Sequence, residues 1–204
     1  MTIDHLNEGR HYIEGSWPLL RGDYVVGDPQ CRVAVVTLAS DLRVENATIS
    51  GTCKTENLGV EKIVANLISN SNIRFLLICG AESKGHLPGN TLISLHKNGL
   101  DEKGRIIGSK GAIPFIQNLT AEAVRRFQAQ IQLIDRIGLE DEEQIGLLVE
   151  EYSSKGEPYH EEPFQAVKLR ARKGLSAPLG AGVGDVLFGS GVTLDSIAWK
   201  VAGG

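Results

Sequence analysis

The 204-residue sequence has few aromatic residues, one methionine, three cysteines and no long apolar run. Its longest apolar stretches, such as 75–79 (FLLIC), are far too short to cross a bilayer. The first ten residues carry several charges and lack the apolar core of a secretory signal. An odd number of cysteines without paired spacing is typical of reduced thiols in the cytosol. We therefore expect a cytoplasmic protein with no membrane span.

A strong charge of either sign is also lacking. The formal net charge is -4, and acidic and basic residues are mixed along the chain without a basic tract or an acidic tail. Nucleic acids and anionic membranes attract basic surfaces, which this composition does not offer. We expect no nucleic-acid partner. A chain of this length buries roughly 70% of its unfolded surface and needs no disulfide or structural metal to fold.

Apolar patterning alternates between runs typical of buried strands and runs with helical spacing. Strands are expected at 32–38 (RVAVVTL), 73–79 (IRFLLIC), 105–107, 131–135 and 165–169. Helices are expected at 57–69 and 88–99, after a cap at Thr120, and from Asp141, which forms a capping box with Gln144, to 151. This alternation predicts an α/β fold with a mostly parallel sheet and helices on both faces.

The composition divides the chain into three parts. Residues 1–16 form an N-terminal extension, 17–170 the α/β domain, and 171–204 a glycine-rich tail with little charge. In the tail, Leu194, Ile197, Ala198 and Val201 follow helical spacing behind Thr193. This predicts a short amphipathic helix, which is too brief to be stable unless it docks. A weakly ordered tail is the alternative.

The segment Gly80–Gly89 leaves a predicted strand and enters a predicted helix, at the sheet edge where such folds bind ligands. Gly80 and Gly85 have the glycine spacing of a phosphate-binding loop. The lysine and hydroxyl residue that must follow are replaced by His86 and Leu87, which excludes nucleoside triphosphate binding. The segment 180–184 (GAGVG) lacks the third glycine of a dinucleotide-binding fingerprint.

What remains is His86, a histidine beside a glycine on the ligand edge. Neutral imidazole is a good ligand for a transition metal. His86-x-x-Gly89 matches the second half of the Asp-x-His-x-x-Gly signature of one group of cobalamin-binding domains, but Lys84 stands at the aspartate position. Glu82 is a candidate to orient the imidazole instead. The alternatives are a loop histidine without a metal and a zinc site with the cysteines, which lack close ligand pairs.

Several further stretches, in order along the chain, resemble the A subunit of tetrahydromethanopterin S-methyltransferase. They extend from Trp17 to Leu169 and include 17–18 (WP), 22–29 (GDYVVGDP), 33–38 (VAVVTL), 53–62 (CKTENLGVEK), 73–75 (IRF), 79–80 (CG), 84–86 (KGH) and 108–115 (GSKGAIPF).

The resemblance implies a Rossmann-like domain that carries a cobamide, with His86 as the ligand to cobalt. It implies a methyl carrier that cycles between Co(I) and methyl-Co(III), from a methyl-tetrahydropterin to a thiol such as coenzyme M. The cofactor would be cobalamin or a related cobamide, for example 5-hydroxybenzimidazolylcobamide. Partners would be other methyltransferase subunits or soluble methyltransferases. Members of the resembled family end in a membrane helix that this tail lacks, so we expect a freestanding homologue.

Three loops are expected to contact the cofactor. Besides His86, the set comprises Glu82, Lys84, Gly85, Leu87, Pro88 and Gly89, then Thr55, Glu56 and Asn57, and finally Gly111, Ala112, Ile113 and Pro114. A plain helix cap is the alternative for the Thr55 group, and an ordinary turn for the Gly111 group. The alternative function is a non-catalytic corrinoid-binding or assembly module that has lost its membrane pump partners.

Overall fold

The computed structural model describes residues 11–12, 17–166, 186–188, 192–195 and 200–202. The chain forms two compact units, Met1–Lys168 and Leu169–Gly204. Within the described residues, no helix combines the length and the hydropathy that crossing a membrane requires.

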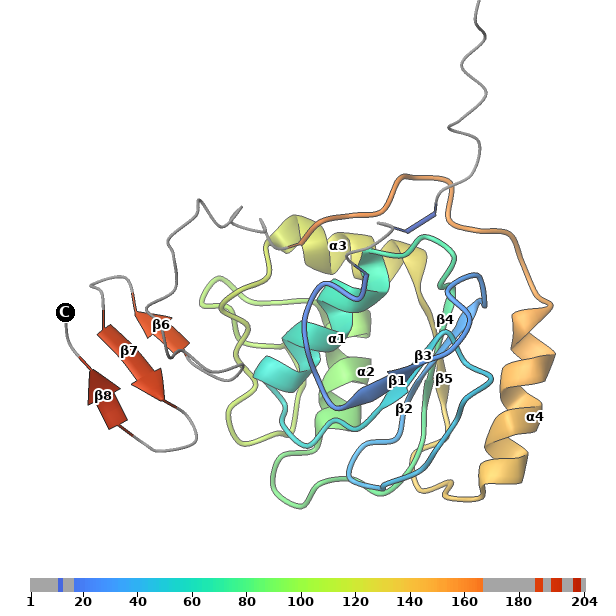
Figure 1. Cartoon of the computed structure of the whole chain (residues 1–204), viewed down its shortest axis with the longest axis horizontal. Coiled ribbons are helices and arrows are strands. Elements are labelled where there is room, and N and C mark those ends of the chain that lie inside the picture. The colour runs from blue at the N-terminus through green and yellow to red at the C-terminus, as the bar shows by residue number, and fades with distance from the viewer. Residues whose placement is uncertain (1–10, 13–16, 167–185, 189–191, 196–199, 203–204) are drawn as a thin grey trace, which may run out of the picture. The chain divides into compact units, whose positions relative to one another are not determined.

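The first unit is built on a five-stranded sheet with the order β1-β3-β2-β4-β5 (Figure 1). Its strands are β1 (Tyr24–Val26), β2 (Val33–Val36), β3 (Ile49–Gly51), β4 (Phe75–Ile78) and β5 (Gln132–Asp135). Four of them run parallel, and β1 pairs antiparallel with β3 at one edge. The predicted mostly parallel sheet is confirmed. The carboxyl ends of four strands therefore meet at one edge, where such folds bind ligands.

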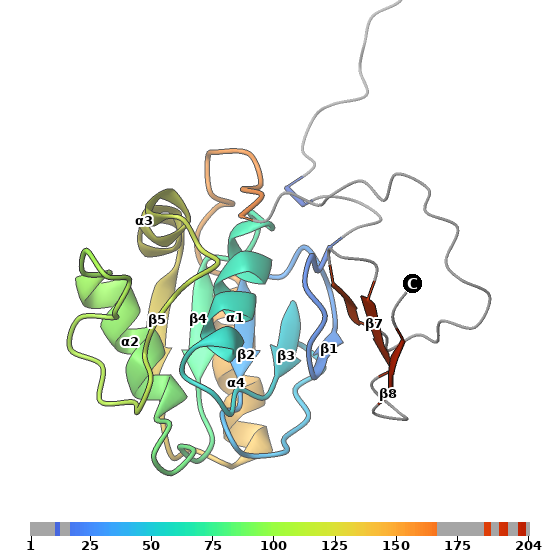
Figure 2. The ribbon, with the colours of Figure 1, turned by 90° about the vertical axis from the view of Figure 1, so that its left-hand side faces the viewer.

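Helices cover both faces of this sheet, as predicted. The helices α1 (Leu58–Ile68), α2 (Pro88–Asn98) and α3 (Ala121–Gln130) lie on one face, and α4 (Glu142–Ser153) lies on the other (Figures 1 and 2). Alternate strand residues supply the two cores. Val36 and Leu76 pack with the first three helices, whereas Val35 and Leu77 pack with Ile145 of α4.

Side-chain caps fix the starts of α3 and α4. The Thr120 hydroxyl accepts a hydrogen bond from Ala123 N at 3.1 Å, as predicted. Asp141 accepts one from Gln144 N at 3.0 Å, which satisfies an otherwise unpaired helix donor. The Gln144 side chain bonds to the Asp141 carboxylate instead of the backbone, so the capping box is only half formed.

The sequence patterns missed β1 and β3. Each has only three residues, too few for periodicity to register. The expected strand at 105–107 is wrong: Arg105 and Ile106 make isolated bridges to two different partners, because the segment folds back on its own loop. At 165–169, residues 165 and 166 are irregular, and the others lie outside the described residues.

The second unit contains an antiparallel sheet of β6 (Val186–Phe188), β7 (Val192–Asp195) and β8 (Lys200–Ala202). The helix expected behind Thr193 is therefore wrong at both of its ends, where the chain is extended. Residues 196–199, between these strands, lie outside the described part. Spacing over so few residues does not separate a helix from β-branched strands that pair with each other.

Candidate functional site

His86 lies at the carboxyl edge of the sheet, in the loop between β4 and α2, and is held by Glu56. Its Nδ1 is 2.7 Å from Glu56 Oε2. The Glu56 side chain is 2% exposed and the His86 side chain 51% exposed. Among the described residues, His86 Nε2 has no hydrogen-bond partner. A buried carboxylate thus fixes one ring nitrogen and leaves the other available at the surface.

The second oxygen of Glu56 binds another loop. Its Oε1 accepts a hydrogen bond from Ile113 N at 2.6 Å. Burial raises the pKa of this carboxyl, but hydrogen bonds from backbone N–H groups and from His86 outweigh burial, and the pKa lies below its ordinary value of 4.5. Glu56 is therefore a carboxylate that joins its own loop to the His86 loop and to the loop that contains Ile113.

Close packing of backbone holds these loops together at Gly111. A Cβ at this position would lie 2.5 Å from the His86 carbonyl oxygen and 2.8 Å from Glu56 Cγ. Backbone and buried side chain leave no room for even a methyl group. Gly111 is therefore required by the close approach of its own backbone to that of His86.

Polar side chains of α2 hold the same loop from the other side. The Thr91 and Ser109 hydroxyls are 2.8 Å apart, and Asn90 Oδ1 accepts a hydrogen bond from Lys110 N at 2.9 Å. Further along, the buried Glu61 of α1 accepts hydrogen bonds from Asn118 N at 3.0 Å and from its side-chain amide at 2.6 Å. The segment from Ser109 to Asn118 is thus fixed at both ends.

The His86 loop enters α2 through a strained residue. Leu87 has φ 48° and ψ 54°, in the left-handed region. This conformation costs a bulky residue about 1–3 kcal/mol and persists only where its surroundings enforce it. Pro88 follows at the first helical position, where a proline is favourable. The turn presents His86 at the surface just before the helix begins.

Glu82 does not orient His86, contrary to the prediction. Its two oxygens accept hydrogen bonds from Gly89 N at 3.1 Å and Asn90 N at 2.7 Å, at the start of α2. There it satisfies free backbone donors and complements the helix dipole. The carboxylate that reaches the imidazole is Glu56, 30 residues earlier in the chain.

Of the remaining predicted residues, some make hydrogen bonds within their own loop or helix start, and others are exposed at the surface. Thr55 and Asn57 both serve the start of α1: the Thr55 hydroxyl accepts from Gly59 N, and Asn57 Oδ1 accepts from Leu58 N. The Pro114 carbonyl accepts from Ile106 N inside its loop. Six members of the predicted set are exposed: Thr55, Lys84, Gly85, His86, Ala112 and Ile113.

Sequence reasoning missed the residues that hold the loops. Ser109 lies inside the stretch 108–115 and could have been selected as a hydroxyl between two glycines. Thr91 and Glu61 look like ordinary helix residues, and no local pattern marks their contacts with a distant loop.

The three cysteines are free thiols. In the part of the chain that the structure describes, there is no cluster of three or more His, Cys, Asp or Glu side chains that could hold a metal ion. Cys53 and Cys79 are buried, and burial raises the pKa of each thiol to about 12. Cys31 is partly exposed, and its Sγ lies 3.0 Å from the Ser153 hydroxyl.

Known proteins resemble this chain over the whole α/β domain. The family model for the A subunit of tetrahydromethanopterin S-methyltransferase matches residues 10–174. A Methanosarcina acetivorans protein, provisionally named as the A subunit of methyltransferase Mtx, is 55% identical over 187 residues, covering 91% of this chain and 94% of the relative. A Methanothermobacter thermautotrophicus protein, named as A subunit 1 of tetrahydromethanopterin S-methyltransferase, is 49% identical over 158 residues, covering 75% of this chain and 66% of the relative. The chain therefore belongs to the family of tetrahydromethanopterin S-methyltransferase A subunits and is one component of a methyltransferase.

Proposed function

We propose that this methyltransferase component binds a corrinoid and that His86 is the protein ligand to its cobalt. The observation that carries the proposal is the pairing of His86 Nδ1 with the buried Glu56 carboxylate at 2.7 Å. A metal-binding histidine usually donates its other ring N–H to such a group, which fixes the tautomer and raises the basicity of the ligating nitrogen. With the proton held on Nδ1, Nε2 offers its lone pair outward.

The surroundings of His86 suit a broad, flat ligand. A Cβ placed on Gly85, the residue before His86, would have no atom within 4 Å, so the space beside this glycine is open. Ala112 and Ile113 are close in sequence to Gly111, which packs against the His86 backbone, and Ile113 is 59% exposed. An exposed imidazole beside an open glycine, with an exposed apolar side chain on a neighbouring loop, would suit a macrocycle whose metal needs one nitrogen from the protein.

The bound corrinoid would supply a cobalt centre that takes up a methyl group as Co(I) and gives it up from methyl-Co(III) to a thiol. The protein residues would do the rest. Glu56 would keep the proton on Nδ1 and the ring in one orientation. Gly111, packed against the His86 carbonyl oxygen, and Leu87, the next residue in the chain, would fix the backbone at His86. The methyl donor would be a methyl-tetrahydropterin, the acceptor a thiol such as coenzyme M, and the partners the other subunits of the methyltransferase.

Mixing the purified chain with aquocobalamin tests this proposal. We expect a coloured complex that survives gel filtration and whose visible spectrum differs from that of the free cofactor, because an imidazole nitrogen binds cobalt. His86→Ala should abolish the spectral difference. His160→Ala is the matched control, because that side chain is 78% exposed and remote from the site in sequence. Unchanged spectra in His86→Ala would remove His86 from the proposal.

A methyl carrier and a passive corrinoid binder differ in turnover. After reduction, the carrier takes up a methyl group and releases it to a thiol when the partner methyltransferase is added. A passive binder would keep the methyl group under the same conditions.

A further inference from the structure

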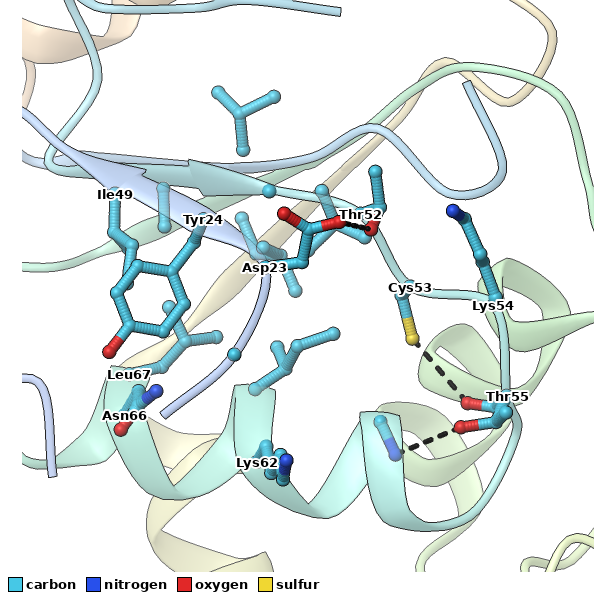
Figure 3. Close-up of a pocket in the computed structure, with 18 of the residues that line it drawn as sticks. Asp23, Tyr24, Ile49, Thr52, Cys53, Lys54, Thr55, Lys62, Asn66 and Leu67 are labelled. Atoms are coloured by element: carbon cyan, nitrogen blue, oxygen red, sulfur yellow. Dashed lines mark hydrogen bonds between the residues drawn. The ribbon is translucent and has the colours of Figure 1, made fainter. Parts of the chain in front are cut away.

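A groove of about 410 Å³ runs between α4 and the loop that follows β5. Its apolar lining comes from Ile137 and Leu139 of the loop and from Leu147 and Leu148 of the helix. Figure 3 shows a different cavity, between α1 and the β1–β3 side of the sheet, and the two share no lining residue. The groove is therefore a separate feature of the surface.

The helix α4 has two apolar stripes, and only one of them faces the sheet. Ile145 and Val149 are fully buried in the core on that face. The residues of α4 that line the groove follow the i, i+3, i+4, i+7 spacing of a helix that packs on another helix: Gln144, Leu147, Leu148 and Glu151. Among the described residues, α4 is the only helix on this face of the sheet (Figure 2). Leu147 is accordingly 59% exposed.

The charges around Leu147 are mostly negative. Glu143, Glu150 and Glu151 lie at i−4, i+3 and i+4 from Leu147, so they are its neighbours on the surface of the helix. All three are exposed, and within the described residues Glu143 and Glu150 form no ion pair. Glu151 pairs with Lys155 at 2.6 Å. An apolar side chain among carboxylates is complementary to apolar residues flanked by lysine or arginine.

The same charges argue against a second copy of this chain as the occupant. Two α4 helices packed through Leu147 would bring the Glu143 and Glu150 carboxylates of both copies together. Like charges that face each other across an interface oppose association. Charge therefore favours a partner that differs from this chain.

We propose that the groove docks a helix of another protein, one whose apolar stripe is flanked by lysine and arginine. The stripe from Gln144 to Glu151 is about 10 Å long, or about two turns, so a short helix fills it. The groove also adjoins the loop that presents His86: a Cβ on Gly89 would lie 2.9 Å from Ile137 Cδ1, and Gly89 follows His86 by three residues. A docked partner would thus sit beside that loop. The docking requires no corrinoid, so its failure would leave the proposed function intact.

Two synthetic helical peptides of about 18 residues test the proposal. They share a leucine stripe, and its flanks carry lysine in one peptide and glutamate in the other. In fluorescence anisotropy titrations, we expect the unaltered chain to bind the lysine peptide and not the glutamate peptide. Added salt should weaken this binding because it screens exposed charges. Equal binding of the two peptides, or no binding of either, would overturn the proposal.

Variants of α4 place the binding on the groove. Leu147→Ser removes the apolar contact, and Glu143→Lys with Glu150→Lys reverses the charge beside it. Each should weaken binding of the lysine peptide by about tenfold, with circular dichroism showing an intact fold. The matched controls are Val25→Ser, at a side chain that is 48% exposed on β1, and Glu102→Lys, on an exposed loop. Both controls should bind the lysine peptide like the unaltered chain. Undiminished binding by the α4 variants would place the peptide elsewhere and overturn the assignment.

Sedimentation velocity separates a different partner from a second copy. We expect the unaltered chain and Leu147→Ser to have the same sedimentation coefficient. A dimer that Leu147→Ser dissociates would assign the groove to a second copy of this chain and overturn the proposal.

Discussion

His86 Nδ1 and Glu56 Oε2 lie 2.7 Å apart, although 30 residues separate them in the sequence. Glu56 follows β3 and His86 follows β4, and β2 lies between these strands in the sheet. The parallel arrangement brings both following loops to one edge. The pair is thus a consequence of topology, and its chemistry depends on a carboxylate that stays charged while buried.

Replacing Glu56 with glutamine keeps the shape of the side chain and removes its charge. The amide is a weaker acceptor for the Nδ1 proton, so Nε2 becomes less basic. We expect corrinoid affinity, measured by spectroscopic titration, to fall by roughly 10- to 100-fold. Glu82→Gln is the contrast, because Glu82 serves α2: it should cost about 1 kcal/mol of unfolding free energy with little change in the spectrum of the complex. If Glu56→Gln and Glu82→Gln changed the spectrum of the corrinoid complex equally, Glu56 would have no special role in orienting His86.

The Glu56 pKa predicts how stability depends on pH. A carboxyl whose folded pKa lies below its unfolded value stabilises the fold above the unfolded pKa, and this contribution is lost as pH falls through the folded pKa. The ordinary value is 4.5 and the folded pKa is lower. Urea unfolding of the unaltered chain and Glu56→Gln should therefore differ most near neutral pH. The difference should shrink below about pH 4.5. A constant difference across that range would contradict a lowered pKa.

Gly111→Ala should disturb the site through the backbone. The added methyl group would lie 2.5 Å from the His86 carbonyl oxygen. We expect a loss of about 1–3 kcal/mol in unfolding free energy, together with weaker corrinoid binding. Gly146→Ala is the control, since it lies within α4 and the added methyl group would be 3.9 Å from the Asn46 side chain. That change should be neutral or stabilising by up to about 1 kcal/mol. A stable Gly111→Ala protein with normal binding would show that the loops have room to move apart.

The three thiols should differ in reactivity. Cys53 and Cys79 are buried with pKa values of about 12, and thiolates are the reactive species. Cys31 is partly exposed. With Ellman's reagent at mildly alkaline pH, we expect one thiol to react quickly in the folded chain and all three to react in denaturant. Cys31→Ser should abolish the fast reaction. Fast labelling of Cys53 would instead mean that the packing around this buried thiol opens.

Patterns with many residues predicted the fold well. The helices α1, α2, α3 and α4 and the central strands β2 and β4 all follow apolar runs long enough to reveal their period. Three-residue strands such as β3 carry no such signal. In the second unit, the helical spacing of a few apolar residues predicted a helix. The structure has β7 and β8 there instead, and these strands pair with each other.

For the site, the sequence predicted the loops and the residues on them but not their contacts. Glu82 was the natural candidate for His86, because it lies four residues away, yet the start of α2 takes up its oxygens. The roles of Glu56 and Glu61 depend on hydrogen bonds to backbone more than 50 residues away, which only the assembled sheet and helices create.

Cobalt ligation by His86 is tested most directly by electron paramagnetic resonance of the Co(II) form of protein-bound cobinamide. This corrinoid has no nucleotide base, so an axial nitrogen must come from the protein. We predict nitrogen splitting of the cobalt lines that changes from a triplet to a doublet pattern when the chain is made with 15N-histidine, and that disappears in His86→Ala. Splitting that persists in His86→Ala, or its absence from the unaltered chain, would contradict the assignment of His86 as the cobalt ligand.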